Sequence, residues 1–299
     1  MRDDINEVNL RLGSISFINS LPVDLGLING SIPTEAEITT GTPAALNEKI
    51  LKKEVDASPV STLWVAEHPK EFLLFPDLSI SSESGVQSVL LFSRYPLKKL
   101  KQKFISITSQ GRTTPVLLEI ICRLRYGFRP NFKVGAIHES PLQGGTIPEG
   151  SDAVLLIGNE ALQTRERLKN SGAVVTDLAE EWKEWTSLPF VFAVWAVRRE
   201  VFLAQAKKVL ELHQALLKSK EWGTTHLEAI LSVAGAETQL PAELLKNYFS
   251  CLSYDFNEGL KCGLKLYYEY AVRCGILSAA VEFEEIGTLP LRPLATSPS

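Results

Sequence analysis

The sequence predicts an α/β fold built as two lobes with a helical C-terminal portion. Over roughly the first two-thirds of the 299 residues, short apolar runs typical of strands alternate with patterns typical of helices. The last third has helical patterns alone. Two apolar strand-like runs, 88–93 and 190–197, bracket a further α/β segment, which indicates that one lobe is inserted into the other.

The strand-like runs are short and apolar, as expected for buried strands of largely parallel sheets. They cover 10–17, 55–60, 88–93, 104–108, 153–157 and 190–197. Between them the sequence predicts helices over 43–53 after Thr42, over 61–67, and over 115–126 after Thr114. Thr114 and Pro115 form a capping residue followed by a proline suited to the first helical position.

Four helices are predicted in the last third of the chain, over 201–219, 226–234, 241–250 and 256–274. Asp255 is followed three residues later by Glu258, which predicts a variant of the capping box at the start of the last helix.

These elements assign residues 1–93 and 195–299 to a first lobe and residues 94–194 to a second. A chain that leaves one lobe, builds another and returns creates a hinged cleft between them. Because ligands favour such interfaces, we expect the functional site in this cleft.

Residues 11–22, with the sequence RLGSISFINSLP, carry the clearest local signal. An apolar strand runs into a small polar turn, and Pro22 suits the first position of a following helix. Free backbone N–H groups at such a strand-to-helix turn favour anions. Asn19 is therefore a candidate ligand contact, although its side chain could instead hold the turn by bonding to its own backbone.

Composition excludes several classes of function. A formal net charge of -4 argues against nucleic acid as the main partner. The polar, acidic segment 1–7 does not resemble a secretion signal, and the apolar runs are too short to span a bilayer, so we expect a cytoplasmic protein without a membrane partner. The cysteines lack metal-site spacing and are expected to be reduced core thiols: Cys122, Cys251, Cys262 and Cys274. The oligomeric state is left open.

Several short motifs follow one another in a specific order along most of the chain. They are ISFINSLP at 15–22, VDASPVS at 55–61, SGVQSVLLFS at 84–93, SQGRTT at 109–114, DAVLLIG at 152–158, and LPFVFA at 188–193 with Trp195. Because these motifs occur in this order and at this spacing, the chain resembles the chorismate dehydratases of the futalosine route to menaquinone. The resemblance implies a two-lobed fold of the type 2 periplasmic-binding-protein kind.

The resemblance also implies an activity and a site. The activity is that of a carbon–oxygen lyase (a hydro-lyase) that removes water from the dianion chorismate to give 3-[(1-carboxyvinyl)oxy]benzoate, without metal or cofactor. Under this interpretation Asn19 and Ser88 lie near the reacting ring. The residues expected to bind the substrate are Ser16, Ser61, Arg112, Thr113, Thr114 and Asn159.

Structural roles remain open for several of these residues. Ser88 could serve the packing of the lobes, Ser61 and the threonines could cap helices, and Arg112 could face solvent. No histidine lies in the motifs: His68, His138, His213 and His226 all fall outside them. The base is therefore either a protein group or the enolpyruvyl carboxylate of the substrate, which proximity would make effective.

The chain departs from the family pattern at three places. Asn159 stands where an aspartate is expected, Ser187 where a glycine is expected, and Ser84–Gly85 replaces a common Gly-Pro. The effect of these changes on activity is left open. Two other functions are compatible with such a fold. One is that of the sister enzyme, which cleaves cyclic dehypoxanthinyl futalosine and whose early Pro-Asn-Asp turn is absent here; the other is that of a non-catalytic small-anion-binding protein.

Overall fold

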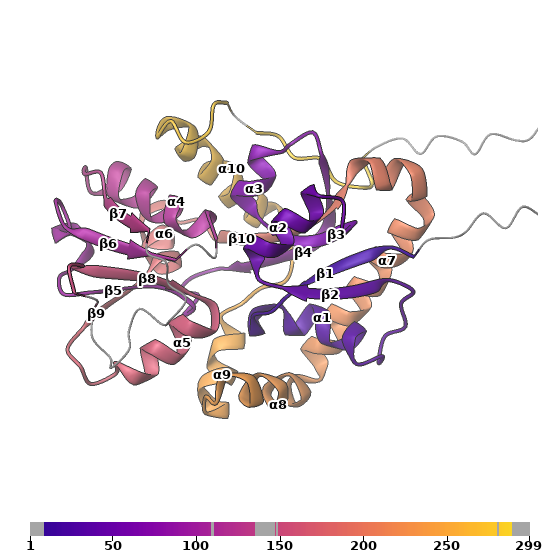
Figure 1. The fold of residues 1–299 in the computed structure, drawn as a ribbon, viewed down its shortest axis with the longest axis horizontal. Coiled ribbons are helices and arrows are strands. Elements are labelled where there is room, and N and C mark those ends of the chain that lie inside the picture. Colours follow the sequence, from indigo (N-terminus) through magenta and orange to yellow (C-terminus); the bar gives the residue numbers. More distant parts are fainter. Residues whose placement is uncertain (1–8, 109–110, 135–146, 148, 280, 289–299) are drawn as a thin grey trace, which may run out of the picture.

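Two five-stranded sheets organise the chain, and each forms the centre of one lobe (Figure 1). The computed structural model describes residues 9–108, 111–134, 147, 149–279 and 281–288. The first sheet has the order β2-β1-β3-β10-β4 and the second the order β7-β6-β8-β5-β9. Their bounds are β1 Arg11–Ile15, β2 Glu37–Gly41, β3 Ala57–Ser61, β4 Phe72–Ser82, β5 Val89–Ser93, β6 Phe104–Ile107, β7 Asn131–Val134, β8 Ala153–Ile157, β9 Val174–Asp177 and β10 Phe190–Arg198.

Both sheets are mixed, with the same pattern of pairing. In the first lobe β1 pairs in parallel with β2 and β3, and β10 runs antiparallel between β3 and β4. In the second lobe β6 pairs in parallel with β7 and β8, and β5 runs antiparallel between β8 and β9. Each sheet thus has a parallel βαβ part and one antiparallel strand that arrives from the other lobe. The sheets are therefore mixed, and the prediction of largely parallel sheets is wrong.

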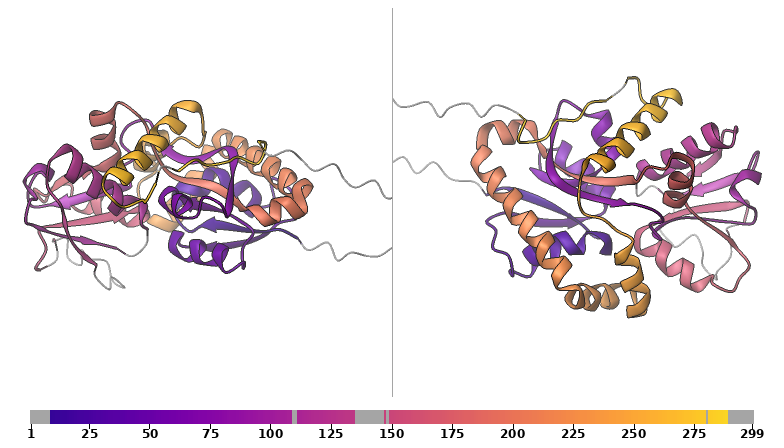
Figure 2. Two further views of the ribbon diagram at one scale, coloured as in Figure 1. Left: turned by 90° about the horizontal axis from the view of Figure 1, so that it is seen from above. Right: turned by 180° about the vertical axis from the view of Figure 1, so that it is seen from behind.

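Helices cover the sheets, and several come from the C-terminal third (Figures 1 and 2). The helices of the first lobe are α1 Leu21–Ile28, α2 Pro43–Leu51, α3 Thr62–Glu67, α7 Arg199–Thr225, α8 Leu227–Thr238 and α9 Ala242–Ser250. Those of the second are α4 Thr113–Ile120, continued by a π-helical turn at Ile121–Arg125, α5 Gly158–Arg167 and α6 Leu178–Thr186. Helix α10, Glu258–Arg273, packs against β10, α3 and α4, so it touches both lobes.

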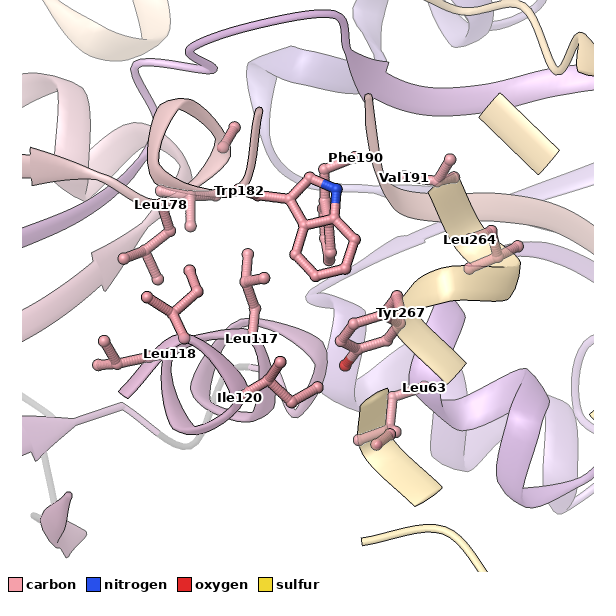
Figure 3. Close-up of a cluster of buried hydrophobic side chains, with 14 of the residues drawn as sticks. Leu63, Leu117, Leu118, Ile120, Leu178, Trp182, Phe190, Val191, Leu264 and Tyr267 are labelled. Carbon is pink, nitrogen blue, oxygen red and sulfur yellow. The ribbon is translucent and has the colours of Figure 1, made fainter. Parts of the chain in front are cut away.

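One hydrophobic cluster runs through both lobes. It contains Leu63 of α3, Leu117 of α4, Trp182 of α6 and Tyr267 of α10 (Figure 3). The Trp182 ring meets the Phe190 and Tyr267 rings edge-on, at centroid distances of 5.4 and 6.4 Å. Because this cluster is continuous, the two lobes share part of their core.

The α/β class and the helical last third agree with the sequence prediction. The two crossings, where the chain passes from one lobe to the other, lie at different residues from those predicted. Strand β5 lies in the second sheet and the whole of β10 lies in the first. The chain therefore changes lobes within 83–88 and 187–189, rather than at 93 and 194. An apolar pattern identifies a buried strand but not the sheet that it joins, which is why the expected boundaries were displaced.

Two predicted helix caps are wrong. Helix α4 begins at Thr113 with Arg112 in the cap position, so Thr114 lies within the helix. Helix α10 is capped by Asn257, whose side chain accepts a hydrogen bond from Leu260 N at 3.0 Å, and not by Asp255. The Asp255 carboxylate instead accepts a hydrogen bond from Lys220 Nζ at 2.8 Å, which places it in a surface ion pair.

The sequence prediction also missed several elements. These are β2, β4, β7 and β9, together with α5 and α6, whereas the helix expected to begin at Pro22 is present as α1. The edge strands β7 and β9 are short and largely unburied, so they lack the continuous apolar run that marked the buried strands.

Candidate functional site

A cavity lies between the two lobes at the ends of several strands. It leaves about 630 Å³ of space between atoms, part of it open to solvent. Its walls come from both sheets and from the first crossing, 83–88. The lining residues are Ile15, Phe17, Asn19, Pro43, Ser61, Ile80, Val86, Ser88, Val89, Gly111, Thr113, Thr114, Ile157, Gly158, Phe192 and Ala193.

Five of the eight residues proposed from the sequence line this cavity: Asn19, Ser61, Ser88, Thr113 and Thr114. They come from separate segments, namely the turn after β1, the end of β3, the crossing before β5, and the start of α4. Among the described lining residues none is charged. An anion in this cavity would therefore meet hydroxyl, amide and backbone N–H groups.

Asn19 lies in a single 3₁₀ turn, Ile18–Ser20, that connects β1 to α1. The turn is held by Ser20, whose hydroxyl lies 2.9 Å from Ile15 O and 3.2 Å from Phe17 O. The Asn19 Oδ1 atom is buried and has no hydrogen-bond partner among the described residues. Because buried polar atoms are normally paired, Asn19 is a strong candidate for contact with a ligand.

Ser61 presents a second unpaired oxygen. It occupies the cap position of α3, but its side chain makes no capping hydrogen bond. Its Oγ atom is buried and, within the part of the chain that the structure describes, lacks a partner. Of the two interpretations left open for Ser61, the geometry favours a ligand contact over helix capping.

Ser88 lies 2 % exposed at the point where the first crossing enters β5. Its backbone carbonyl accepts a hydrogen bond from Gly158 N at 2.8 Å. Its hydroxyl accepts one from Tyr248 Oη, on α9, at 3.2 Å. Tyr248 was not singled out from the sequence, because it lies in a helical pattern far along the chain and belongs to none of the motifs.

Thr113 and Thr114 lie in the first turn of α4, where backbone N–H groups have no partner within the helix. The Thr113 hydroxyl accepts a hydrogen bond from Leu63 N at 3.1 Å, which ties α4 to α3. The Thr113 carbonyl accepts one from Tyr267 Oη, also at 3.1 Å. Thr113 therefore joins the lobes as well as lining the cavity.

Three residues proposed to bind substrate lie outside the cavity wall. Ser16 is exposed, and its backbone N–H donates a hydrogen bond to Gly41 O at 2.9 Å. Arg112 points to solvent and forms an ion pair with Glu67 at 2.8 Å. The side chains of neighbouring residues in a turn point in different directions. A motif that contains one residue lining the cavity therefore also contains residues whose side chains face away from the cavity.

Asn159 is the third proposed substrate-binding residue that lies outside the cavity wall, and its side chain joins the two lobes. Its Oδ1 atom accepts a hydrogen bond from Ile18 N at 3.1 Å, so it joins α5 of the second lobe to the Asn19 turn of the first. Beside it, Gly158 has φ +63°, and a Cβ atom there would lie 2.9 Å from the Phe17 ring. A glycine is needed for both reasons. An aspartate, expected at 159 from the family pattern, could accept the same hydrogen bond.

A buried carboxyl lies beneath the turn that carries Asn19. Asp24 of α1 is 2 % exposed, and its Oδ2 atom accepts a hydrogen bond from Ser14 Oγ of β1 at 2.7 Å. Its Oδ1 atom has no partner among the described residues. Burial raises the pKa of Asp24 to about 7.

The described histidines do not line the cavity. His68 pairs with Glu71, His213 bonds to Pro76 O, and His226 stacks on Trp222; His138 and motif residues 109–110 lie outside the described residues. Among the residues described, no group of three or more histidine, cysteine or acidic side chains could hold a metal ion. Within the same ranges, no helix combines the length and apolar character needed to cross a bilayer.

Comparisons with known proteins identify the family. A family model described as menaquinone biosynthesis matches residues 10–273. A chorismate dehydratase from Thermus thermophilus is 30% identical over 240 residues, which cover 76% of this chain and 83% of that protein.

Solved structures show the same fold. A protein from Archaeoglobus fulgidus superposes with a TM-score of 0.72 at 19% identity, covering 90% of this chain and 98% of that one. A Candida albicans protein described as having the periplasmic-binding-protein fold superposes with a TM-score of 0.63 at 12% identity, covering 93% and 97%. The structure thus has the two-lobed periplasmic-binding-protein fold, and the chain belongs to the menaquinone biosynthesis family.

Proposed function

We propose that this protein is a chorismate dehydratase, a carbon–oxygen lyase that removes water from chorismate to give 3-[(1-carboxyvinyl)oxy]benzoate in the futalosine route to menaquinone. The family and the name of the Thermus thermophilus relative support this. The observation that carries it is the interlobe cavity, whose described lining holds no charged side chain. In it the buried oxygens of Asn19 and Ser61 lack partners among the described residues.

The cavity suits a small dianion with an apolar ring. Phe17 and Phe192 line it and offer aromatic surface to a six-membered ring. The first turn of α4 supplies free N–H groups, and Ser61 and Thr114 supply hydroxyl donors for carboxylate oxygens. Since no lining side chain in the described set is anionic, a substrate with two carboxylates meets no direct repulsion.

The elimination breaks the C3–H bond and the C4–O bond of the ring. The C3–H bond is activated by the ring carboxylate through the conjugated double bond, and the electron pair of that bond becomes the second bond of a new C3=C4 double bond. The C4 hydroxyl group leaves with the electron pair of the C4–O bond and takes up one proton to become water. We propose that Asn19 and Ser88 lie beside these atoms, and that a hydrogen bond donated to the C4 oxygen assists its departure.

The base is proposed to be the enolpyruvyl carboxylate of the substrate. Within the described residues, the cavity wall presents no histidine, carboxylate or lysine that could take the C3 proton. A carboxylate held beside the proton in the same molecule benefits from effective molarities of about 10⁵ M or more. The protein then acts by fixing the conformation of the substrate. A cytoplasmic location and the lack of nucleic-acid and membrane partners stay predictions from the sequence.

The test is to incubate the purified protein with chorismate and a metal chelator and to follow the products by mass-resolved chromatography. The proposal predicts a new species lighter than chorismate by one water, formed in proportion to enzyme concentration. Chorismate that binds without being converted would instead identify an anion-binding protein. If chorismate stays unchanged and cyclic dehypoxanthinyl futalosine is consumed, the protein is the sister enzyme.

A further inference from the structure

Tyr248 donates a hydrogen bond to Ser88, which lines the cavity. The ring belongs to a buried cluster that also holds Ile18, next to Asn19, and Leu245 and Phe249 of the same helix. Tyr248 is 0 % exposed and does not line the cavity, so it would not touch a substrate there. We infer that Tyr248 is a positioning residue for the dehydration: by donating to Ser88 Oγ, it directs the proton of Ser88 into the cavity.

The direction of this hydrogen bond follows from the two hydroxyl groups. The Tyr248 Oη atom lies 3.2 Å from Ser88 Oγ, and the phenol is the donor. A phenol is a stronger donor than an aliphatic alcohol, whereas the serine oxygen has two lone pairs and is the stronger acceptor. Burial raises the pKa of the Tyr248 phenol, which therefore keeps its proton throughout the physiological pH range.

This arrangement fixes what Ser88 can do. A serine hydroxyl has one proton, and while it accepts from Tyr248 that proton cannot point back along the same line. Among the described residues, no protein atom accepts a hydrogen bond from Ser88 Oγ. The Ser88 proton is then available to a group in the cavity, which makes Ser88 a donor toward the substrate rather than an acceptor.

Hydrogen bonds to the backbone hold the segments that carry Tyr248 and Ser88. The Ser82 hydroxyl donates to Cys251 O at 2.9 Å, so the segment after α9 is tied to the end of β4, where the first crossing begins. The Ser88 carbonyl is held by Gly158 N. The backbone near Tyr248 and the backbone of Ser88 are thus both held by hydrogen bonds. A donor that is to stabilise a developing charge has to be held in position in this way.

The inference rests on the proposed function, because it assigns a role in the same reaction. In the elimination, the C4 oxygen gains negative charge as its bond to carbon breaks. A donor already directed at that oxygen stabilises the transition state more than the ground state. Loss of the Tyr248 hydroxyl is therefore expected to lower kcat and to leave KM nearly unchanged.

A double-mutant cycle tests the inference. Tyr248→Phe retains the ring and removes one neutral hydrogen bond, so we expect kcat to fall by about tenfold with KM within about twofold of wild type. In the Ser88→Ala background the same change is expected to alter kcat by less than about twofold, because Tyr248 acts through Ser88. The control is Tyr126→Phe, which loses a phenolic hydrogen bond to Glu181 in the second lobe, away from the cavity.

Two further measurements separate this role from a structural one. Thermal unfolding of Tyr248→Phe checks that the variant folds. A variant with 3-fluorotyrosine at position 248 retains both the ring and the hydroxyl. Its kcat is expected to stay within about twofold of wild type, even if Tyr248→Phe is less stable than wild type.

The outcomes distinguish the two proposals. If the wild-type protein converts chorismate but the effects of Tyr248→Phe and Ser88→Ala multiply independently, the inference is wrong and the proposed function stands. A change in KM alone for Tyr248→Phe would overturn it as well. If the wild-type protein does not convert chorismate, the proposed function fails, and the role of Tyr248 in it fails too.

Discussion

Replacing Asp24 with asparagine is expected to stabilise the protein at neutral and alkaline pH. The carboxyl is fully buried beneath the Asn19 turn, and its Oδ1 atom has no partner among the described residues. Burial raises its pKa from the ordinary value of 3.8 to about 7. Asparagine is neutral, has nearly the same shape, and can still accept the hydrogen bond from Ser14.

The sign and size of the effect follow from linkage. Since the pKa is higher in the folded protein, the folded state binds one more proton than the unfolded chain between about pH 4 and about pH 7. The contribution of Asp24 to the free energy of unfolding therefore falls as pH rises through this window. A rise in pKa from 3.8 to about 7 corresponds to a loss of about 4 kcal/mol, complete above about pH 7.

The assay is urea unfolding followed by tryptophan fluorescence, for wild type and Asp24→Asn, at several pH values. The stability difference between the two proteins is expected to be within about 1 kcal/mol near pH 4 and to grow to about 3–4 kcal/mol in favour of Asp24→Asn near pH 8. Asp77→Asn makes the same chemical change at an exposed site and serves as the control. A difference between wild type and Asp24→Asn that does not vary with pH would refute the reasoning.

Three further substitutions test separate parts of the structure. Asn159→Ala removes the interlobe hydrogen bond to Ile18 and is expected to raise KM by about threefold to tenfold. Asn159→Asp retains an acceptor, and its KM is expected to stay near that of wild type. Equal steady-state kinetics for the two variants would contradict this. Ser187→Gly relieves a left-handed residue at φ 62° and is expected to add about 0.5–1 kcal/mol to the unfolding free energy, and a lower thermal midpoint would argue against it. Arg112→Gln is expected to leave kcat/KM within about twofold, because the side chain faces solvent; a larger drop would place it at the substrate.

The fold class could be predicted because the buried strands leave continuous apolar runs. Strands β5, β8 and β10 are buried along nearly their whole length, and all three were found. The short edge strands β7 and β9 and the choice of sheet could not be predicted, since neither leaves a continuous apolar run in the sequence. Both depend on long-range pairing, as when β10 meets β3 and β4, which lie far earlier in the chain.

The candidate site shows the same division between local and long-range information. Asn19 and Ser88 belong to motifs at strand ends, and both line the cavity. Tyr248 reaches Ser88 from 160 residues away along the chain, so no spacing rule could pair them. Asn159 illustrates the converse, because its motif was recognised but its side chain turns to Ile18 instead of the cavity.

The central claim is that the interlobe cavity carries out the dehydration through Asn19 and Ser88. It is tested most directly by comparing kcat/KM for chorismate in Asn19→Ala, Ser88→Ala and the matched control Ser16→Ala, which changes an exposed serine of the same turn outside the cavity wall. The account predicts losses of about 100-fold or more for the first two and less than about twofold for the control. Activity retained in Asn19→Ala and Ser88→Ala, or lost equally in Ser16→Ala, would contradict it.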